Sequence, residues 1–201
     1  TGDLYITQNT NDGDIILECD NGSGGVTTYL QLDGGGALTR SYRNFRAQDN
    51  FKLQVGSDGD LNIYHDSTGV SSRIENETGP LYITNKANDA DIYFQSDDGS
   101  GGVATYFYLD GSMADGTNRY TAFPDNSRLR FGNGLDLDIH HDGSNSYINQ
   151  TGTGDLYIQQ TVDDGDIYFV NDDGSGGTTQ YFRIDGGSHL NYFSKTVFLP
   201  D

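Results

Sequence analysis

Pairs of aspartates separated by one residue occur at the same place in three similar stretches of the chain. Side chains two positions apart on a strand lie on the same face, so paired carboxylates repel each other unless water surrounds them or a cation bridges them. Carboxylate oxygens are preferred ligands of Ca²⁺. The pattern therefore predicts either a Ca²⁺ site or a solvated turn that needs no ion. The pairs are Asp12 with Asp14, Asp89 with Asp91, and Asp164 with Asp166.

Two histidines, His65 and His141, occupy matching positions and are each followed by an aspartate. Imidazoles from several copies of the chain that met on a shared axis could hold a transition metal. His140 and His141 are adjacent, so on a strand they point to opposite faces and only one of them could reach such an axis. The alternative is a turn histidine whose ring is held by the following aspartate.

The third recurrent group is aromatic. Tyr5, Tyr82 and Tyr157 each stand between a leucine and an isoleucine, and on a strand they would project from the opposite face. A row of such amphipathic rings could stack against glycans, or it could pack across strands and stiffen the protein. Both interpretations stay open at this point.

Sequence motifs of common catalytic sites are not present. The chain has neither a Gly-x-Ser-x-Gly elbow nor a phosphate-binding Gly-x-x-x-x-Gly-Lys loop. The single cysteine, Cys19, has Ser96 and Asn171 at its matching positions, so we expect it to pack as a small apolar side chain. We predict no enzymatic activity in this segment and no cofactor other than Ca²⁺.

The chain consists of repeats with boundaries at 1–78, 79–153 and 154–201. The same Leu-Tyr-Ile phrase follows Gly2, Gly79 and Gly154, so successive copies begin 77 and 75 residues apart. A Gly-Ser-Gly-Gly run also recurs once in each copy. Repetition of this kind extends a structure by adding units. The third copy stops where the second reaches Asp125, so we expect a segment of a longer chain.

Composition favours strands over helices. Of 30 acidic residues only three are Glu, whereas Asp and Gly, which are turn formers, dominate the chain with 27 and 28 positions. No segment has the apolar spacing of an amphipathic helix or the length of a membrane span. The net charge of -19 and the pI near 4.1 argue against nucleic acid and anionic membranes as partners.

Alternating apolar residues predict about six short strands in each complete repeat. In the first repeat the alternating positions are Leu4 and Ile6, Ile15 with Leu17 and Cys19, Leu30 and Leu32, Leu53 and Val55, and Leu61 and Ile63. The second repeat has the same pattern, beginning with Leu81 and Ile83.

The apolar face of each repeat is narrow compared with the length of backbone that folding must order. Several copies joined around a shared axis, most simply three, would bury the same strands on more sides and cover the sheet edges. We therefore expect an elongated, repetitive β-fibre with a trimeric shaft of the β-helix or β-prism kind. A single-chain β-solenoid that stacks its own coils is the alternative.

Several phrases of the sequence resemble repeats in tail-fibre and related virion structural proteins of marine bacteriophages. The phrases lie at residues 63–66 (Ile-Tyr-His-Asp), 123–132, 139–148 and 155–158 (Asp-Leu-Tyr-Ile). The resemblance extends over essentially the whole chain. It implies an elongated, trimeric, β-rich fibre of the virion that holds a host-attachment element away from the particle. The resemblance implies no catalytic residue in this chain.

Two other functions remain open. One is the repeat region of a bacterial or archaeal extracellular filament or adhesin, located at the cell surface and built as a solenoid. The other is a carbohydrate-binding fibre domain that uses the recurrent tyrosines. In every case the expected partner is the chain itself. For the fibre shaft and the filament, a host glycan or receptor would bind through regions outside this segment.

Overall fold

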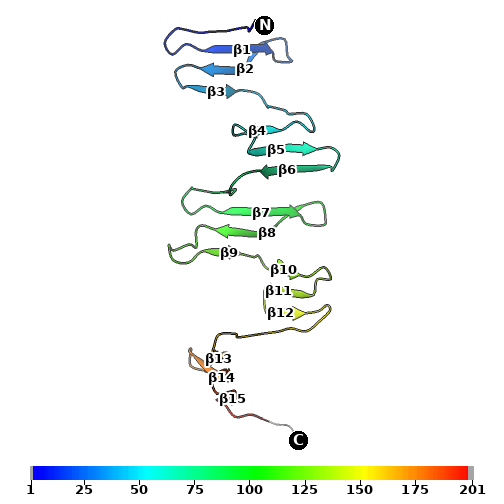
Figure 1. Ribbon diagram of the computed structural model, residues 1–201, viewed down its shortest axis with the longest axis vertical. Helices are drawn as coiled ribbons and strands as arrows, with labels where there is room; N and C mark the ends of the chain where they lie inside the picture. Colours follow the sequence, from blue (N-terminus) through cyan, green and yellow to red (C-terminus); the bar gives the residue numbers. More distant parts are fainter. Residues whose placement is uncertain (1, 199–201) are drawn as a thin grey trace. The chain divides into compact units, whose positions relative to one another are not determined.

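The computed structural model describes residues 2–198 and is all-β (Figure 1). It contains fifteen strands and, within this range, no helix. The strands form five antiparallel sheets, each made of three strands that are consecutive in the sequence. The expected all-β fold class is confirmed. The chain divides into two units, Thr1–Ile83 and Thr84–Asp201.

Unit 1 contains two sheets. The first consists of β1 (Ile15–Asp20), β2 (Val26–Asp33) and β3 (Leu38–Ser41). The second consists of β4 (Leu53–Val55), β5 (Leu61–Asp66) and β6 (Ser71–Asn76). In each sheet the middle strand of the sequence is also the central strand in space.

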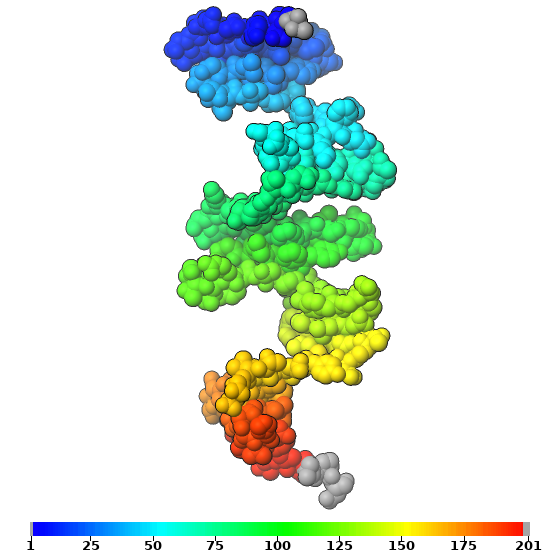
Figure 2. Space-filling view, viewed as in Figure 1, coloured from blue at the N-terminus to red at the C-terminus, as the bar shows by residue number. Residues whose placement is uncertain are grey.

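Unit 2 contains three sheets with the same strand order. They consist of β7 (Ile92–Asp97), β8 (Val103–Asp110) and β9 (Tyr120–Ala122); of β10 (Arg128–Phe131), β11 (Leu137–His141) and β12 (Ser146–Gln150); and of β13 (Ile167–Asp172), β14 (Thr178–Asp185) and β15 (Leu190–Phe193). In the space-filling view, β7–β9 in green and β10–β12 in yellow-green form neighbouring layers (Figure 2).

The Gly-Ser-Gly-Gly runs form the hairpin turns between the first two strands of a sheet. In the β7–β8 turn, Oδ1 of Asp98 accepts hydrogen bonds from the backbone amides of Ser100 and Gly102, at 2.7 and 3.0 Å. Gly99 and Gly101 have φ values of 80° and 87°, which glycine adopts without the steric cost of a Cβ atom. The expected turn chemistry is confirmed.

A register shift follows each of these turns. In β7–β8 it lies between Phe94 and Gln95, where the partner strand carries one extra residue, Tyr106. The Tyr106 hydroxyl donates a hydrogen bond to the carbonyl of Asp97 at 2.9 Å. Tyr29 and Tyr181 make the equivalent bond in their sheets. The bulge and its tyrosine are thus a property of the repeat.

The prediction of a strand at each Leu-Tyr-Ile segment is wrong. The Leu-Tyr-Ile segments at 4–6, 81–83 and 156–158 form no strand, and Leu4 and Ile6 are 86% and 65% exposed. Alternation shows which side chains share a face, but a strand also needs a neighbour for its backbone hydrogen bonds. These segments have no such neighbour within the part of the chain described here.

The described part of the chain forms no hydrophobic core of its own. Among residues 2–198, no apolar side chain is buried, and the buried polar or charged residues are Asn62, Asp110 and Asp138. Each sheet is a separate antiparallel meander, and no solenoid coil is formed in the described range. The expected β-helix and the alternative single-chain solenoid are therefore not confirmed.

Candidate functional site

Each sheet has one apolar face, and the register of its strands determines which residues form that face. In the β7–β9 sheet, Ile92 lies opposite Leu109 and Phe94 lies opposite Phe107. The rings of Phe94 and Phe107 stack with their centroids 4.4 Å apart, and Phe123 continues the stack 5.7 Å beyond Phe107. Aromatic pairs in cross-strand register stabilise a sheet beyond the area that they bury.

The other sheets repeat this arrangement, and we call these five surfaces the apolar faces. In the remaining sheets they are formed by Ile15, Leu17, Leu30 and Leu32; by Leu53, Val55, Leu61, Ile63 and Ile74; by Leu129, Phe131, Leu137, Ile139 and Ile148; and by Ile167, Phe169, Phe182, Ile184 and Phe193.

The apolar faces remain substantially open to solvent in the single chain. Leu17 is 51% exposed, Ile63 43% and Phe193 61%. On one of these faces a cavity of about 480 Å³ is lined by Leu129, Ile139 and Ile148. Soluble proteins rarely leave apolar patches of this extent uncovered unless the patch contacts another molecule. The apolar faces are the candidate functional site.

The opposite face of the β10–β12 sheet carries a charged network centred on Asp138, which is 5% exposed. Its Oδ2 accepts hydrogen bonds from Nη1 of Arg128 at 2.8 Å and from Nε of Arg130 at 3.1 Å. Nδ1 of His140 lies 2.7 Å from its Oδ1. The hydrogen bond from Arg128 is the main cause of a lowered pKa of Asp138, which opposes the effect of burial.

The β4–β6 sheet has a network at the matching place in which the neutral Asn62 replaces Asp138. Asn62 is 2% exposed and accepts a hydrogen bond from Nε2 of Gln54 at 2.9 Å. Beside it, the Tyr64 hydroxyl donates to Glu75 at 2.9 Å, which lowers the pKa of Glu75 and raises that of Tyr64. The ammonium of Lys52 lies 4.7 Å from the centre of the Tyr64 ring.

In the β13–β15 sheet, Arg183 organises the polar face. It forms ion pairs with Asp166 at 3.2 Å and with Asp185 at 2.6 Å, and its guanidinium lies over the rings of Tyr168 and Tyr192. All three networks lie on the side of their sheet opposite the apolar face. The two faces of these three sheets therefore differ sharply in polarity.

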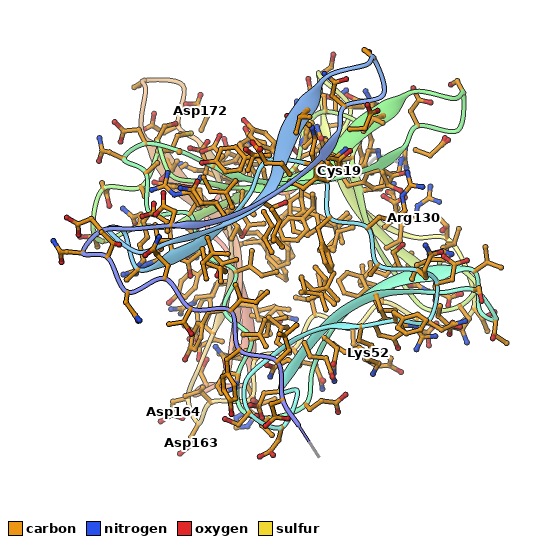
Figure 3. The ribbon with its side chains drawn as sticks, turned by 90° about the horizontal axis from the view of Figure 1, so that it is seen from above. Cys19, Lys52, Arg130, Asp163, Asp164 and Asp172 are labelled. Atoms are coloured by element: carbon orange, nitrogen blue, oxygen red, sulfur yellow. The ribbon has the colours of Figure 1, made fainter. Side chains whose placement is uncertain are left out.

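The recurrent aspartate pairs are divided between two structural roles. The first member of each pair, Asp12, Asp89 or Asp164, has a φ of 56–57° and shapes a turn. The second member accepts a hydrogen bond from a glycine amide beyond the next hairpin, as Asp91 does from Gly111 at 2.9 Å. Figure 3 labels Asp164, which lies in the turn before β13, and Asp172, the last residue of that strand. Ca²⁺ binding at these pairs stays a prediction.

The two matching histidines lie at the border of an apolar face. His65 and His141 share the face of Ile63 and Ile139, and each ring nitrogen Nδ1 lies 3.1 Å from a serine hydroxyl across the strand pair. His140 is on the opposite face. This agrees with the expectation that adjacent histidines point in opposite directions. A metal held by His65 or His141 on a shared axis stays a prediction.

The remaining candidates lie on the surface. Tyr5 and Tyr82 are both 81% exposed and Tyr157 is 75% exposed, in segments that are not strands. Glycan stacking on these rings stays a prediction. Cys19 is exposed, so the expectation that it packs as an apolar side chain is wrong. It lies beyond the register shift of its strand pair, at the end next to the turn.

No cluster of three or more histidine, cysteine or acidic side chains suited to a metal is found among residues 2–198. In the same range no helix has the length and apolar character needed to cross a bilayer. Comparisons of the chain with models of protein families, with curated proteins and with solved structures found no significant match.

Proposed function

We propose that this chain is a structural repeat protein that assembles with copies of itself through the apolar faces. The assembly would be a homotrimeric shaft of the prism kind, with apolar faces toward the axis and charged networks toward solvent. Its work would be mechanical, namely to hold a host-attachment element at a distance. The resemblance to bacteriophage tail-fibre repeats supports a place in the virion and a role as a tail-fibre shaft.

The exposure of the apolar faces is the observation that carries this proposal. A face lined by leucine, isoleucine and phenylalanine gains roughly 25 cal/mol for each Å² of apolar area that a neighbouring copy removes from water. Residues 2–198 form five such faces, and no other layer within that range covers them. Because every repeat has the same apolar face, a second copy in register would cover all of them at once.

The Leu-Tyr-Ile segments support the same proposal. They have the alternating sequence of strands, yet residues 2–198 of the single chain provide no strand partner for them. A neighbouring copy could supply that partner, because the outer strands of a three-stranded sheet have unpaired backbone groups on one side. The segments recur once in each repeat, so such pairing would also fix the register between copies.

A matched pair of substitutions tests the proposal. Leu17 and Ile16 are neighbours on β1 with exposures of 51% and 50%, but Leu17 lies on the apolar face and Ile16 on the opposite face. We expect Leu17→Asp to lower the fraction of assembled chain in sedimentation velocity and Ile16→Asp to leave it near that of the unchanged protein. Equal effects of the two substitutions would refute assembly through the apolar faces.

The alternative of a bacterial or archaeal surface filament shares the self-association but predicts one chain in each cross-section. It would require the sheets to join into a solenoid, whereas residues 2–198 form five separate sheets. A carbohydrate-binding fibre domain predicts glycan contacts at Tyr5, Tyr82 and Tyr157. Replacement of these three residues by serine, followed by glycan-array binding, would distinguish that function from a purely mechanical one.

A further inference from the structure

A cleft of about 670 Å³ lies within unit 2, between β8 and the start of β10. One wall carries Tyr106, and the other carries Pro124, Ser127, Arg128 and Arg130. Its volume falls within the range of about 300–1,000 Å³ that is usual for small-molecule sites. Arg128 and Arg130 belong to the polar face of their sheet, so the cleft would stay open when the apolar faces are covered.

Several contacts hold the two walls in place. The Tyr106 hydroxyl is bonded to the carbonyl of Asp97, while the residue remains 51% exposed. In the opposite wall, the amide of Asn126 donates to the carbonyl of His141 at 2.8 Å. The hydroxyl of Ser127 lies 3.4 Å from the carbonyl of Thr105 and connects the walls. The cleft is therefore preformed.

Arg128 and Arg130 carry the positive charge of the cleft. Each donates one hydrogen bond to Oδ2 of the buried Asp138, Arg128 through Nη1 at 2.8 Å and Arg130 through Nε at 3.1 Å. These bonds fix the orientation of each guanidinium. A guanidinium has five N–H donors, so the others are free for an anionic ligand within the described part of the chain. Both side chains are about two-fifths exposed, and Arg130 projects from β10 (Figure 3).

The lining combines three kinds of chemistry. The Tyr106 ring and Pro124 offer apolar surface to the flat side of a sugar ring. The guanidiniums match a carboxylate in bidentate geometry. Asp125 and Asn126 offer oxygen and nitrogen atoms to hydroxyl groups. We propose that this cleft binds a carboxylated saccharide, with the carboxylate on Arg128 and Arg130 and the ring on Tyr106.

The first repeat provides a natural comparison, because it has different residues at the same positions. The positive-φ residues Asn50 and Asn126 mark the equivalent turns. Four residues after these asparagines, Gln54 replaces Arg130, and its Nε2 donates a hydrogen bond to Oδ1 of Asn62. Phe51, which is 67% exposed, replaces Ser127. Lys52 stands at the position of Arg128, so the matching place in the first repeat lacks both guanidiniums and carries a bulky ring.

The test is isothermal titration calorimetry of the full chain with digalacturonic acid, its dimethyl ester and acetate. We expect digalacturonic acid to bind and the ester and acetate to bind about tenfold more weakly, because each lacks either the charge or the rings. Arg130→Gln and Ser127→Phe introduce the residues of the first repeat, which that repeat tolerates. We expect each to weaken digalacturonic acid binding about tenfold.

Control variants are available in the first repeat. Phe51→Ala and Lys52→Gln should leave digalacturonic acid binding unchanged, and circular dichroism should show that all variants keep their strands. Lack of saturable binding at about 10 mM, or equal binding of the dimethyl ester, would overturn the proposal. Equal binding by Arg130→Gln would also overturn it. If acetate bound as tightly as the disaccharide, the cleft would be a simple anion site and the saccharide assignment would be wrong.

Discussion

The backbone amide of Gly111 donates a hydrogen bond to Oδ1 of Asp91 across 2.9 Å, which joins the turn before β7 to the turn after β8. The same bond links Gly34 to Asp14 and Gly186 to Asp166, each at 3.0 Å. One hydrogen bond thus closes the first sheet of every repeat. We call this contact the hairpin clasp.

The hairpin clasp requires glycine. A Cβ atom on Gly111 would lie 2.5 Å from the carbonyl oxygen of Ala90, which is backbone and cannot move aside cheaply. We predict that Gly111→Ala lowers the free energy of unfolding by about 1–3 kcal/mol and Asp91→Ala by about 1 kcal/mol. Urea unfolding at one protein concentration measures both. Gly2→Ala is the control, because nothing lies within 4 Å of its added Cβ.

Removal of calcium should leave the fold intact. The second carboxylate of each aspartate pair is already bonded within the protein, since Asp91 also accepts from the Tyr93 hydroxyl at 2.8 Å. We therefore expect the circular dichroism spectrum and the unfolding midpoint to be the same with EGTA and with Ca²⁺. A lower midpoint in EGTA would favour the Ca²⁺ site that the sequence pattern allows.

Acid should weaken the hairpin turns. Bonds from the amides of Ser100 and Gly102 lower the pKa of Asp98 in the folded chain below its unfolded value, and Asp142 is lowered in the same way by Asn145 and Ser144. A lowered folded pKa contributes stability that is complete above the unfolded pKa of about 3.9 and is lost as pH falls through the folded value. We predict a falling unfolding midpoint below about pH 4.

One substitution isolates a single turn in this pH dependence. Asn21 occupies the position of Asp98 in the first repeat, and its Oδ1 accepts the same two amide bonds at 2.7 and 3.2 Å. Asp98→Asn should therefore keep the turn at neutral pH while it removes one titrating group. A slope of stability against pH that equals that of the unchanged chain would contradict this assignment.

Salt should favour assembly. Each copy carries a formal charge of -19, so copies brought together repel one another. The screening length falls from about 30 Å at 0.01 M salt to about 3 Å at 1 M. We predict that the midpoint concentration of assembly, measured by sedimentation, falls as NaCl rises through this range. A midpoint that rises with salt would show that attraction between charges holds the copies together.

The sequence predicted the strands whose apolar alternation coincides with a hairpin turn, such as β7 and β8. It failed at Leu4–Ile6, because alternation carries no information about the presence of a strand partner. It also did not identify β3 and β6, where polar residues such as Thr39 and Arg73 occupy the strand. These strands are specified by their backbone pairing with β2 and β5 and not by an apolar pattern of their own.

The candidate sites were predicted less well than the fold. The recurrence of Asp91 and Asp166 was visible in the sequence, but their partners, Gly111 and Gly186, lie twenty residues away and depend on hairpin register. The network around Asp138 was not foreseen. The spacing of Arg128 and Arg130 places both on one face of a strand, and this was the available signal.

The molar mass of the chain in solution, measured by sedimentation equilibrium at physiological salt, distinguishes a trimer from a single chain. Assembly of three copies through the apolar faces predicts a species of three times the 21.9 kDa of the single chain. A stable species of 21.9 kDa at all concentrations, with the strand content of the folded protein, would contradict it.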